Sequence, residues 1–180
     1  KLDSKIDLKQ NLILSVLNAI IGDTMSSRLF QSLRENSGFC YNVYSFINLF
    51  QDCGFWCFYA TSSKENCLNV AKNLIQIVDR FFNNEISQEE INYAKQHLCG
   101  EEIINSEDVE NRMKRLFRLY SFDFEMETNE ETVAQIRAIT KNDILEVLPK
   151  LLNLEEKSLV VYGPKINKSI KQEIENVFRK

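Results

Sequence analysis

Side chains able to do chemistry are few in this sequence, and their spacing matches no self-sufficient catalytic motif. His97 is the only histidine, so a metal site with two histidines cannot be built from this chain. The sequence contains no His-x-x-Glu-His or His-Glu-x-x-His motif, no Gly-x-Ser-x-Gly nucleophile elbow and no Gly-x-x-x-x-Gly-Lys phosphate loop. We therefore expect this chain alone to bind no metal or cofactor and to be inactive as an enzyme.

The remaining reactive residue types have simpler structural interpretations. His97 lies in a polar stretch that favours a solvated helix surface. Glu89 and Glu90 fall in the first turn of a helix that Ser87 is expected to cap, where carboxylates stabilise the positive helix end. The five cysteines are an odd number without the short paired spacing of a zinc knuckle or a disulfide scaffold. They predict reduced thiols and a reducing intracellular compartment, either the cytoplasm or an organelle matrix.

Length and charge narrow the class of protein further. The 180 residues, at 21.1 kDa, suit one ordinary domain, and we expect residues 1–180 to form a single one. Lys and Arg number 22 against 26 Asp and Glu, a net charge of −4, so nucleic acid is not an expected partner. No apolar run reaches the ~18 residues of a membrane span, and no signal-peptide pattern opens the chain.

The first half of the chain predicts two helices followed by a strand pair. Residues 11–21 are apolar nearly all round and predict a buried helix, and a second helix follows over 27–36. Residues 39–50 and 54–62 are rich in aromatic and β-branched residues and predict two antiparallel strands. Strict alternation along the first strand would put one set of side chains on one face: Tyr41, Val43, Ser45, Ile47 and Leu49. Large apolar groups occur on both faces, which suggests that helices cover one face and a partner or cavity lies at the other.

The second half is mainly helical in pattern. Capping sequences predict helix starts at 62–65, 87–90, 128–131 and, more weakly, 140–143. Apolar residues at helical spacing line the segment after 108, namely Val109, Met113, Leu116, Phe117 and Tyr120. One late strand is expected over 158–163, and a last amphipathic helix follows Pro164. Strands and helices that are segregated in this way predict an α+β fold, with a mostly antiparallel sheet and helices packed on one face.

The segment 25–46 reads MSSRLFQSLRENSGFCYNVYSF and is the most specific motif in the chain. It resembles, almost without change, the second-half signature of the pitrilysin (insulinase) family of zinc metallopeptidases, which includes the mitochondrial processing peptidase. Weaker likenesses continue through DCGFWCFYATS (52–62), SQEEINYAKQHL (87–98) and LVVYGP (159–164). The resemblance therefore extends from about Asn11 to the end of the chain.

This resemblance implies an enzyme built from two related α+β halves whose sheets face each other across a closed chamber. The first half would bind the catalytic zinc, so this chain would be the C-terminal, non-zinc half, paired with a zinc-bearing N-terminal half or partner subunit in a homo- or hetero-dimer. The family's second half contributes an arginine and a tyrosine seven residues apart, which match Arg34 and Tyr41. The substrate implied is a peptide, hydrolysed by an endopeptidase.

Arg34 and Tyr41 suit the role that the resemblance implies. Peptide hydrolysis develops negative charge on the carbonyl oxygen, and a phenol or guanidinium aimed at that oxygen stabilises the transition state. The structural alternative is that Arg34 complements a helix C-terminus and Tyr41 fills a strand position. Family second halves also open with a strand that no apolar segment before Leu8 matches, so we expect this domain to lack its first strand or to have it outside this sequence.

Two further functions are compatible with the same resemblance. The chain could belong to a non-catalytic structural subunit, like the core proteins of the respiratory cytochrome bc complex. It could also be an inactive partner whose arginine and tyrosine complete the site of a separate zinc subunit. An intact or degenerate His-x-x-Glu-His motif elsewhere in the same protein would separate these functions.

Overall fold

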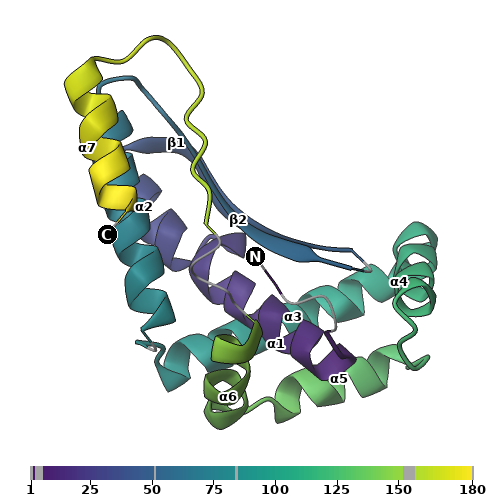
Figure 1. Ribbon diagram of the computed structural model, residues 1–180. Helices are drawn as coiled ribbons and strands as arrows, with labels where there is room; N and C mark the ends of the chain where they lie inside the picture. The colour runs from purple at the N-terminus through teal and green to yellow at the C-terminus, as the bar shows by residue number, and fades with distance from the viewer. Residues whose placement is uncertain (1, 3–5, 51, 84, 152–156, 180) are drawn as a thin grey trace.

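The computed structural model describes residues 2, 6–50, 52–83, 85–151 and 157–179 (Figure 1). Helices dominate, and a two-stranded antiparallel sheet lies along one side of them, which confirms the α+β class with helices on one face of the sheet. The elements in chain order are α1 (Leu8–Asn18), η1 (Ala19–Asp23), η2 (Phe30–Asn36), β1 (Cys40–Leu49), β2 (Gly54–Ser62), α2 (Cys67–Phe82), α3 (Gln88–Glu107), α4 (Val109–Ser121), α5 (Asn129–Ala138), α6 (Lys141–Leu151) and α7 (Lys168–Phe178).

Two short helical segments, η1 and η2, are π-helical. η1 directly continues α1 and covers the end of the predicted first helix. η2 precedes β1 and covers most of the predicted second helix. π-helical turns are rare and occur often at functional sites. η2 lies within the segment 25–46 that carries the family-like signature, and η1 lies just before it.

The hairpin of β1 and β2 packs one face on the helical core. Val43 and Ser45 on this inner face are buried, and Trp56 packs against Phe81 and Phe82 of α2. The Asn18 side-chain oxygen of α1 accepts hydrogen bonds from the Ser45 hydroxyl at 2.7 Å and from the Trp56 indole N–H at 2.9 Å. This buried polar triad fixes the hairpin on α1, because its donors and acceptors would be costly to leave unpaired.

Three of the four predicted capping sequences do begin helices. Ser87 and Thr128 each form a complete capping box with the glutamate three residues later, and Thr140 exchanges hydrogen bonds with Asp143 at the start of α6. The expected start at 62–65 is wrong. A turn occupies residues 64–66 there, and α2 begins only at Cys67, without a side-chain cap.

The apolar residues of α4 face outward, contrary to the usual inward packing of such a stripe. Leu119 is buried at 3% exposure, whereas Phe117 is 70% exposed and the other four members of the stripe are exposed as well. Polar contacts of Arg115 set the orientation of α4 instead.

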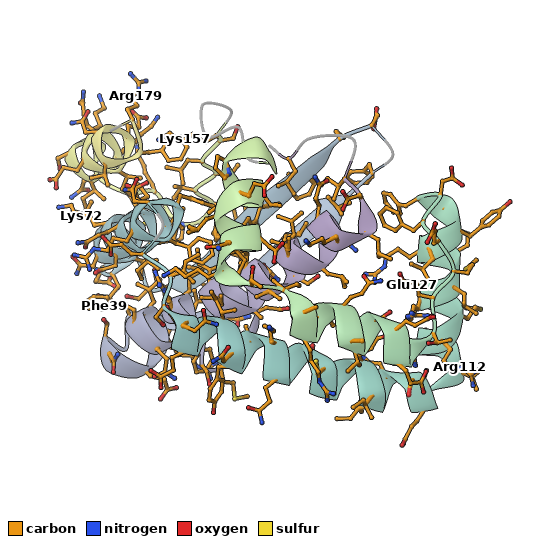
Figure 2. The ribbon with its side chains drawn as sticks, turned by 90° about the horizontal axis from the view of Figure 1, so that it is seen from below. Phe39, Lys72, Arg112, Glu127, Lys157 and Arg179 are labelled. Carbon is orange, nitrogen blue, oxygen red and sulfur yellow. The ribbon has the colours of Figure 1, made fainter. Side chains whose placement is uncertain are left out.

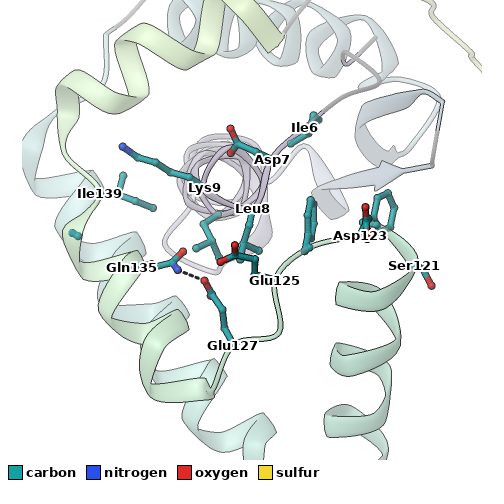
Figure 3. A pocket seen from close by; sticks show the side chains of 14 residues that line it. Ile6, Asp7, Leu8, Lys9, Ser121, Asp123, Glu125, Glu127, Gln135 and Ile139 are labelled. Atoms are coloured by element: carbon teal, nitrogen blue, oxygen red, sulfur yellow. Dashed lines mark hydrogen bonds between the residues drawn. The ribbon is translucent and has the colours of Figure 1, made fainter.

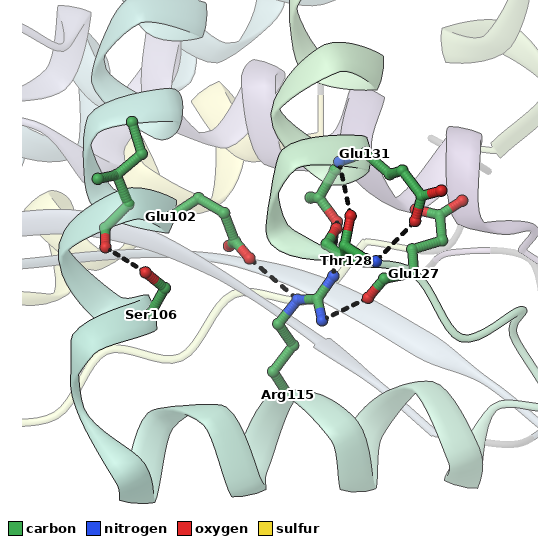
Figure 4. Close-up of polar contacts among 8 residues, drawn as sticks. Glu102, Ser106, Arg115, Glu127, Thr128 and Glu131 are labelled. Atoms are coloured by element: carbon green, nitrogen blue, oxygen red, sulfur yellow. Dashed lines mark hydrogen bonds and ion pairs between the residues drawn. The ribbon is translucent and has the colours of Figure 1, made fainter.

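Arg115 joins α4 to α3 and α5 through a set of polar contacts (Figure 4). Its guanidinium pairs with Glu102 at 2.9 Å and donates to the Glu127 carbonyl at 2.8 Å, the Thr128 carbonyl at 3.2 Å and the Thr132 hydroxyl at 2.7 Å. A guanidinium with this many partners holds one orientation. It therefore fixes the angle of α4 against its neighbours.

The late strand expected over 158–163 is wrong, since residues 157–167 form neither strand nor helix. Their side chains are largely exposed, and no described residue hydrogen-bonds to the backbone of 158–163. The β propensity of this segment becomes a strand only where a neighbouring edge supplies hydrogen bonds. The expected last helix is confirmed as α7, which packs beside α2 with Ile174 buried and Lys72 paired to Glu173 at 3.2 Å (Figures 1 and 2).

Most of the segment that the first family strand would occupy, residues 1 and 3–5, lies outside the described residues. Leu2 is described, and its N–H donates to the Gly54 carbonyl at 2.8 Å, an isolated antiparallel bridge at the outer edge of β2. Within the described part of the chain, no helix is long and apolar enough to cross a membrane.

Candidate functional site

The candidate site lies where η2 ends and β1 begins. Gly38 adopts a left-handed backbone with φ of 61° and stops the helix, a conformation that favours glycine. The Gly38 and Phe39 N–H groups donate to the carbonyls of Arg34 and Leu33, at 3.2 and 3.0 Å. Leu33 is buried, so the end of η2 is anchored in the core while the side chain of its neighbour Arg34 projects into solvent.

Arg34 is exposed and positioned by stacking rather than by an ion pair. Its guanidinium carbon lies 4.9 Å from the centroid of the Phe30 ring, one turn earlier in η2. A cation over an aromatic face is weakly attracted, which limits the rotamers of the arginine. Among the described residues none accepts a hydrogen bond from this guanidinium, so its donors are available to a ligand.

Arg28, in the same motif, has a structural role instead. Its Nε lies 2.6 Å and its Nη2 2.9 Å from the two Glu90 oxygens, and its guanidinium carbon lies 5.6 Å from the Phe81 ring centroid. Burial alone would raise the pKa of Glu90, but hydrogen bonds from Arg28 and Ser87 outweigh burial and hold this pKa below its ordinary value. The signature thus contains a partly buried ion pair that joins it to α3, and an exposed arginine, Arg34, near the end of η2.

Tyr41 lies at a β-bulge that turns its side chain outward. Cys40 pairs with Ser62 and Asn42 pairs with Thr61, so Tyr41 has no partner on β2. Strict alternation predicts that Tyr41 shares a face with Val43, which is wrong: Val43 is 3% exposed and Tyr41 is 76% exposed. The extra residue in β1 turns the Tyr41 side chain to the outer face of the sheet, as bulges next to binding sites often do. The Tyr41 hydroxyl has no hydrogen-bond partner among the described residues.

Arg34 and Tyr41 therefore project from two adjoining elements, since η2 packs against β1. No hydrogen bond joins the two side chains. Both carry uncommitted hydrogen-bond donors into solvent. Their arrangement is able to bind an external oxygen that carries negative charge, and their catalytic role stays a prediction.

The other reactive groups are not part of this arrangement. His97 is exposed on α3, and its Nε2 lies 3.3 Å from a Glu101 oxygen, as expected for a surface histidine. None of the five cysteines forms a disulfide, and burial raises the pKa of the Cys40 and Cys57 thiols, which disfavours the nucleophilic thiolate. No group of three or more His, Cys, Asp or Glu side chains in the described ranges could hold a metal ion.

A hollow of about 1030 Å³ lies elsewhere, between the start of α1, the 121–127 segment and α5 (Figure 3). Acidic and apolar side chains line it, and Gln135 donates a hydrogen bond to Glu127 at its wall. Neither Arg34 nor Tyr41 contributes to its lining. The hollow is therefore separate from the candidate site.

A set of residues on the outer face of the hairpin was not assigned to the site by sequence. Tyr44, Phe46 and Tyr59 lie on the face that no core residue covers, together with the outward-turned Tyr41. The available signal was the presence of large apolar groups on both faces of the first strand. It indicated a partner or cavity at the second face, but not that Tyr41 would lie on that face with Tyr44, Phe46 and Tyr59.

The fold and the exposed Arg34 and Tyr41 define a class: an α+β domain that offers hydrogen-bond donors to a ligand but, in its described residues, no metal site. The family model for the peptidase M16 inactive domain matches residues 2–98. This chain belongs to that family, which confirms the resemblance to the non-zinc half of the zinc peptidases.

Individual relatives agree with this assignment. An uncharacterized zinc protease of Mycobacterium tuberculosis is 33% identical over 151 residues, which are 84% of this chain and 34% of that protein. The peptidase M16 inactive domain from Pseudomonas fluorescens superposes with a TM-score of 0.71 at 22% identity, over 83% of this chain and 36% of the other. A chain of complex III2 from Candida albicans gives 0.68 at 19%, over 83% and 38%. This chain spans about a third of the length of the curated relatives that it matches.

Proposed function

We propose that this chain is the substrate-binding half of a zinc-dependent endopeptidase and supplies Arg34 and Tyr41 to the reacting peptide. The observation that carries the proposal is the bulge that exposes Tyr41, next to an arginine whose donors have no partner among the described residues. A tyrosine that only filled a strand position would follow the alternation and point into the core. An arginine that only stabilised the fold would form an ion pair within the domain, as Arg28 does with Glu90.

In this function the two side chains act on the carbonyl of the bond to be cleaved. Water adds to the carbonyl carbon, negative charge develops on the carbonyl oxygen, and the amine leaves with a proton. The Tyr41 hydroxyl donates to that oxygen and the Arg34 guanidinium holds the peptide or shares its charge. Loss of one such donor typically costs about 3–4 kcal/mol of transition-state stabilisation.

The zinc ion of such an enzyme does not fit the described residues of this chain, which lack a suitable set of ligands. The matched 151 residues are 34% of the relatives called zinc proteases, which are therefore about two and a half times as long as this chain, and their remaining sequence is where a zinc-binding half would be sought. The proposal therefore requires a second half or a partner subunit, and assigns this chain only peptide binding and charge stabilisation.

The proposal is tested by Tyr41→Phe in the complete protein that contains this chain. We expect turnover of a peptide to fall at least about tenfold with unchanged zinc content, because only the phenol donor is lost. Tyr93→Phe is the matched control, since Tyr93 is an exposed tyrosine on α3, away from the hairpin. Equal turnover by Tyr41→Phe and the unmodified protein would contradict the proposed role of the Tyr41 hydroxyl.

A second function, that of a non-catalytic subunit, is supported by the structural likeness to a chain of complex III2, which shows a shared fold. In that case the complete protein would lack an intact His-x-x-Glu-His motif and would not hydrolyse peptides. If a separate zinc subunit gained activity only on addition of this protein, the Arg34 and Tyr41 pair would be acting in trans. Peptidase assays with and without such a subunit distinguish the three cases.

A further inference from the structure

The outer face of the hairpin carries a continuous row of aromatic rings. Tyr44 and Tyr59 are direct cross-strand partners with ring centroids 4.9 Å apart, and Phe46 lies 6.0 Å from Tyr44. Phe55 lies 6.3 Å from Phe46 and 6.2 Å from Phe50. These spacings are typical of favourable aromatic pairs. We call these five residues the aromatic ladder.

The aromatic ladder is not part of the protein core. Tyr44, Tyr59, Phe55 and Phe50 are between 37% and 52% exposed, whereas the opposite face of the same strands packs on α1 and α2. Contiguous apolar surface that a folded chain leaves in water commonly marks a binding site. The ladder thus has the character of a surface that another molecule covers.

Charge limits what that molecule can be. β1 and β2 contain no Asp, Glu, Lys or Arg, so the ladder has no ionic partner for a charged group placed on it. Burial of a charge that has no ion-pair partner is costly, and the weak attraction of a cation to a ring face offsets only part of that cost. The covering segment must therefore be uncharged along the length of the ladder, with side chains that gain from contact with rings.

The bulge places the ladder in line with Tyr41. The distance along β1, at ~3.3 Å per residue, is about 10 Å from Tyr41 to Tyr44 and about 30 Å to Phe50. An extended peptide whose carbonyl lies at the Tyr41 hydroxyl would therefore pass over the ladder with residues roughly three to nine positions away from the bond that is cleaved.

We propose that the aromatic ladder selects substrates by binding an uncharged, apolar segment of the extended peptide on one side of the bond to be cleaved. This inference rests on the proposed function, because Tyr41 supplies the reference point. It names the substrate class: polypeptides with aromatic and aliphatic side chains, rather than charges, at a distance of several residues from that bond.

The test uses the double variant Tyr44→Thr/Tyr59→Thr in the complete protein, since threonine keeps a high strand propensity. Two peptide substrates of equal length differ only at the positions about three to nine residues from the cleaved bond, where one carries Phe and Leu and the other Asp and Lys. We expect kcat/KM for the apolar peptide to fall at least about tenfold and that for the charged peptide to change less than about twofold.

The control is Phe117→Thr/Tyr120→Thr, which removes two exposed rings from α4 and should leave kcat/KM unchanged for both peptides. Fluorescence anisotropy of the labelled peptides measures the same selectivity in binding without turnover, and thermal melting checks that each variant is folded. An equal effect of the ladder variant on both peptides, or no effect on either, overturns the inference. So does a loss of self-association in sedimentation with unchanged peptide binding, which would make the ladder a contact between copies of the chain.

Failure of the proposed function gives a different result. Tyr41→Phe should slow both peptides equally, because the carbonyl is common to them. In that case Tyr41→Phe leaves turnover unchanged while the ladder variant still binds the apolar peptide more weakly in the anisotropy assay. That result would contradict the catalytic role of Tyr41 and would leave the ladder as a peptide-binding surface.

Discussion

Gly22 shows how closely η1 approaches the hairpin. A Cβ atom at this position would lie 2.4 Å from the Ser45 hydroxyl oxygen and 2.6 Å from the Ser45 nitrogen. Ser45 also donates to Asn18, so it cannot rotate away without loss of a buried hydrogen bond. The missing side chain of Gly22 thus allows the close approach of η1 to β1.

We expect Gly22→Ala to destabilise the fold by about 1–3 kcal/mol, because overpacking here pushes on backbone as well as side chain. Gly100→Ala is the control, since a Cβ at Gly100 meets nothing within 4 Å and alanine favours the interior of helix α3. Urea denaturation of both variants measures the difference. Equal stability of the two variants would contradict the close contact at Gly22.

Helix α4 shows that an apolar pattern predicts that a helix forms but not which side of the helix packs on the domain. Its stripe has the spacing of a core face, yet Arg115 and Leu119 are the side chains that attach the helix to the domain. The stripe itself faces solvent. The helix period follows from the sequence, whereas the choice between two possible inner faces depends on where Glu102 and the 127–132 segment lie.

We expect Leu119→Ala to cost about 2–5 kcal/mol of unfolding free energy, and Phe117→Ala to stay within about 0.5 kcal/mol, because only the first residue is buried. Thermal melting of the two variants provides the measurement. A large loss of stability in Phe117→Ala would show that the apolar face of α4 packs inward.

At the scale of the whole molecule, ion pairs join segments that are far apart in sequence. Glu90 pairs with Arg28, and Asp143 pairs with Lys9 of α1 at 2.6 Å. Hydrogen bonds from Lys9 and Thr140 hold the pKa of Asp143 well below its ordinary value. Both carboxylates thus bind protons less readily in the folded state than in the unfolded chain.

We therefore expect stability to fall as the pH drops below about 4.5, since the unfolded state then takes up more protons than the folded one. Above that pH, the contribution of these carboxylates is fully present. Glu90→Gln should be less stable near pH 7 and should show a shallower loss toward about pH 3.5, whereas Glu89→Gln, an exposed neighbour, should keep the original slope. Urea denaturation across this pH range tests the sign, and an identical slope in both variants would contradict it.

The sequence by itself determined the helix starts at Ser87 and Thr128, the antiparallel strand pair and the family, because caps, runs of aromatic and β-branched residues, and the MSSRLF segment are local patterns. Only the tertiary structure decided the facing of Tyr41, the outward stripe of α4 and the absence of a strand over 158–163. Each of these depends on a partner distant in sequence: the register of β2, the contacts of Arg115, or a neighbouring strand edge. The physical reason is that periodicity specifies which side chains share a face, while long-range hydrogen bonds and packing specify where that face points.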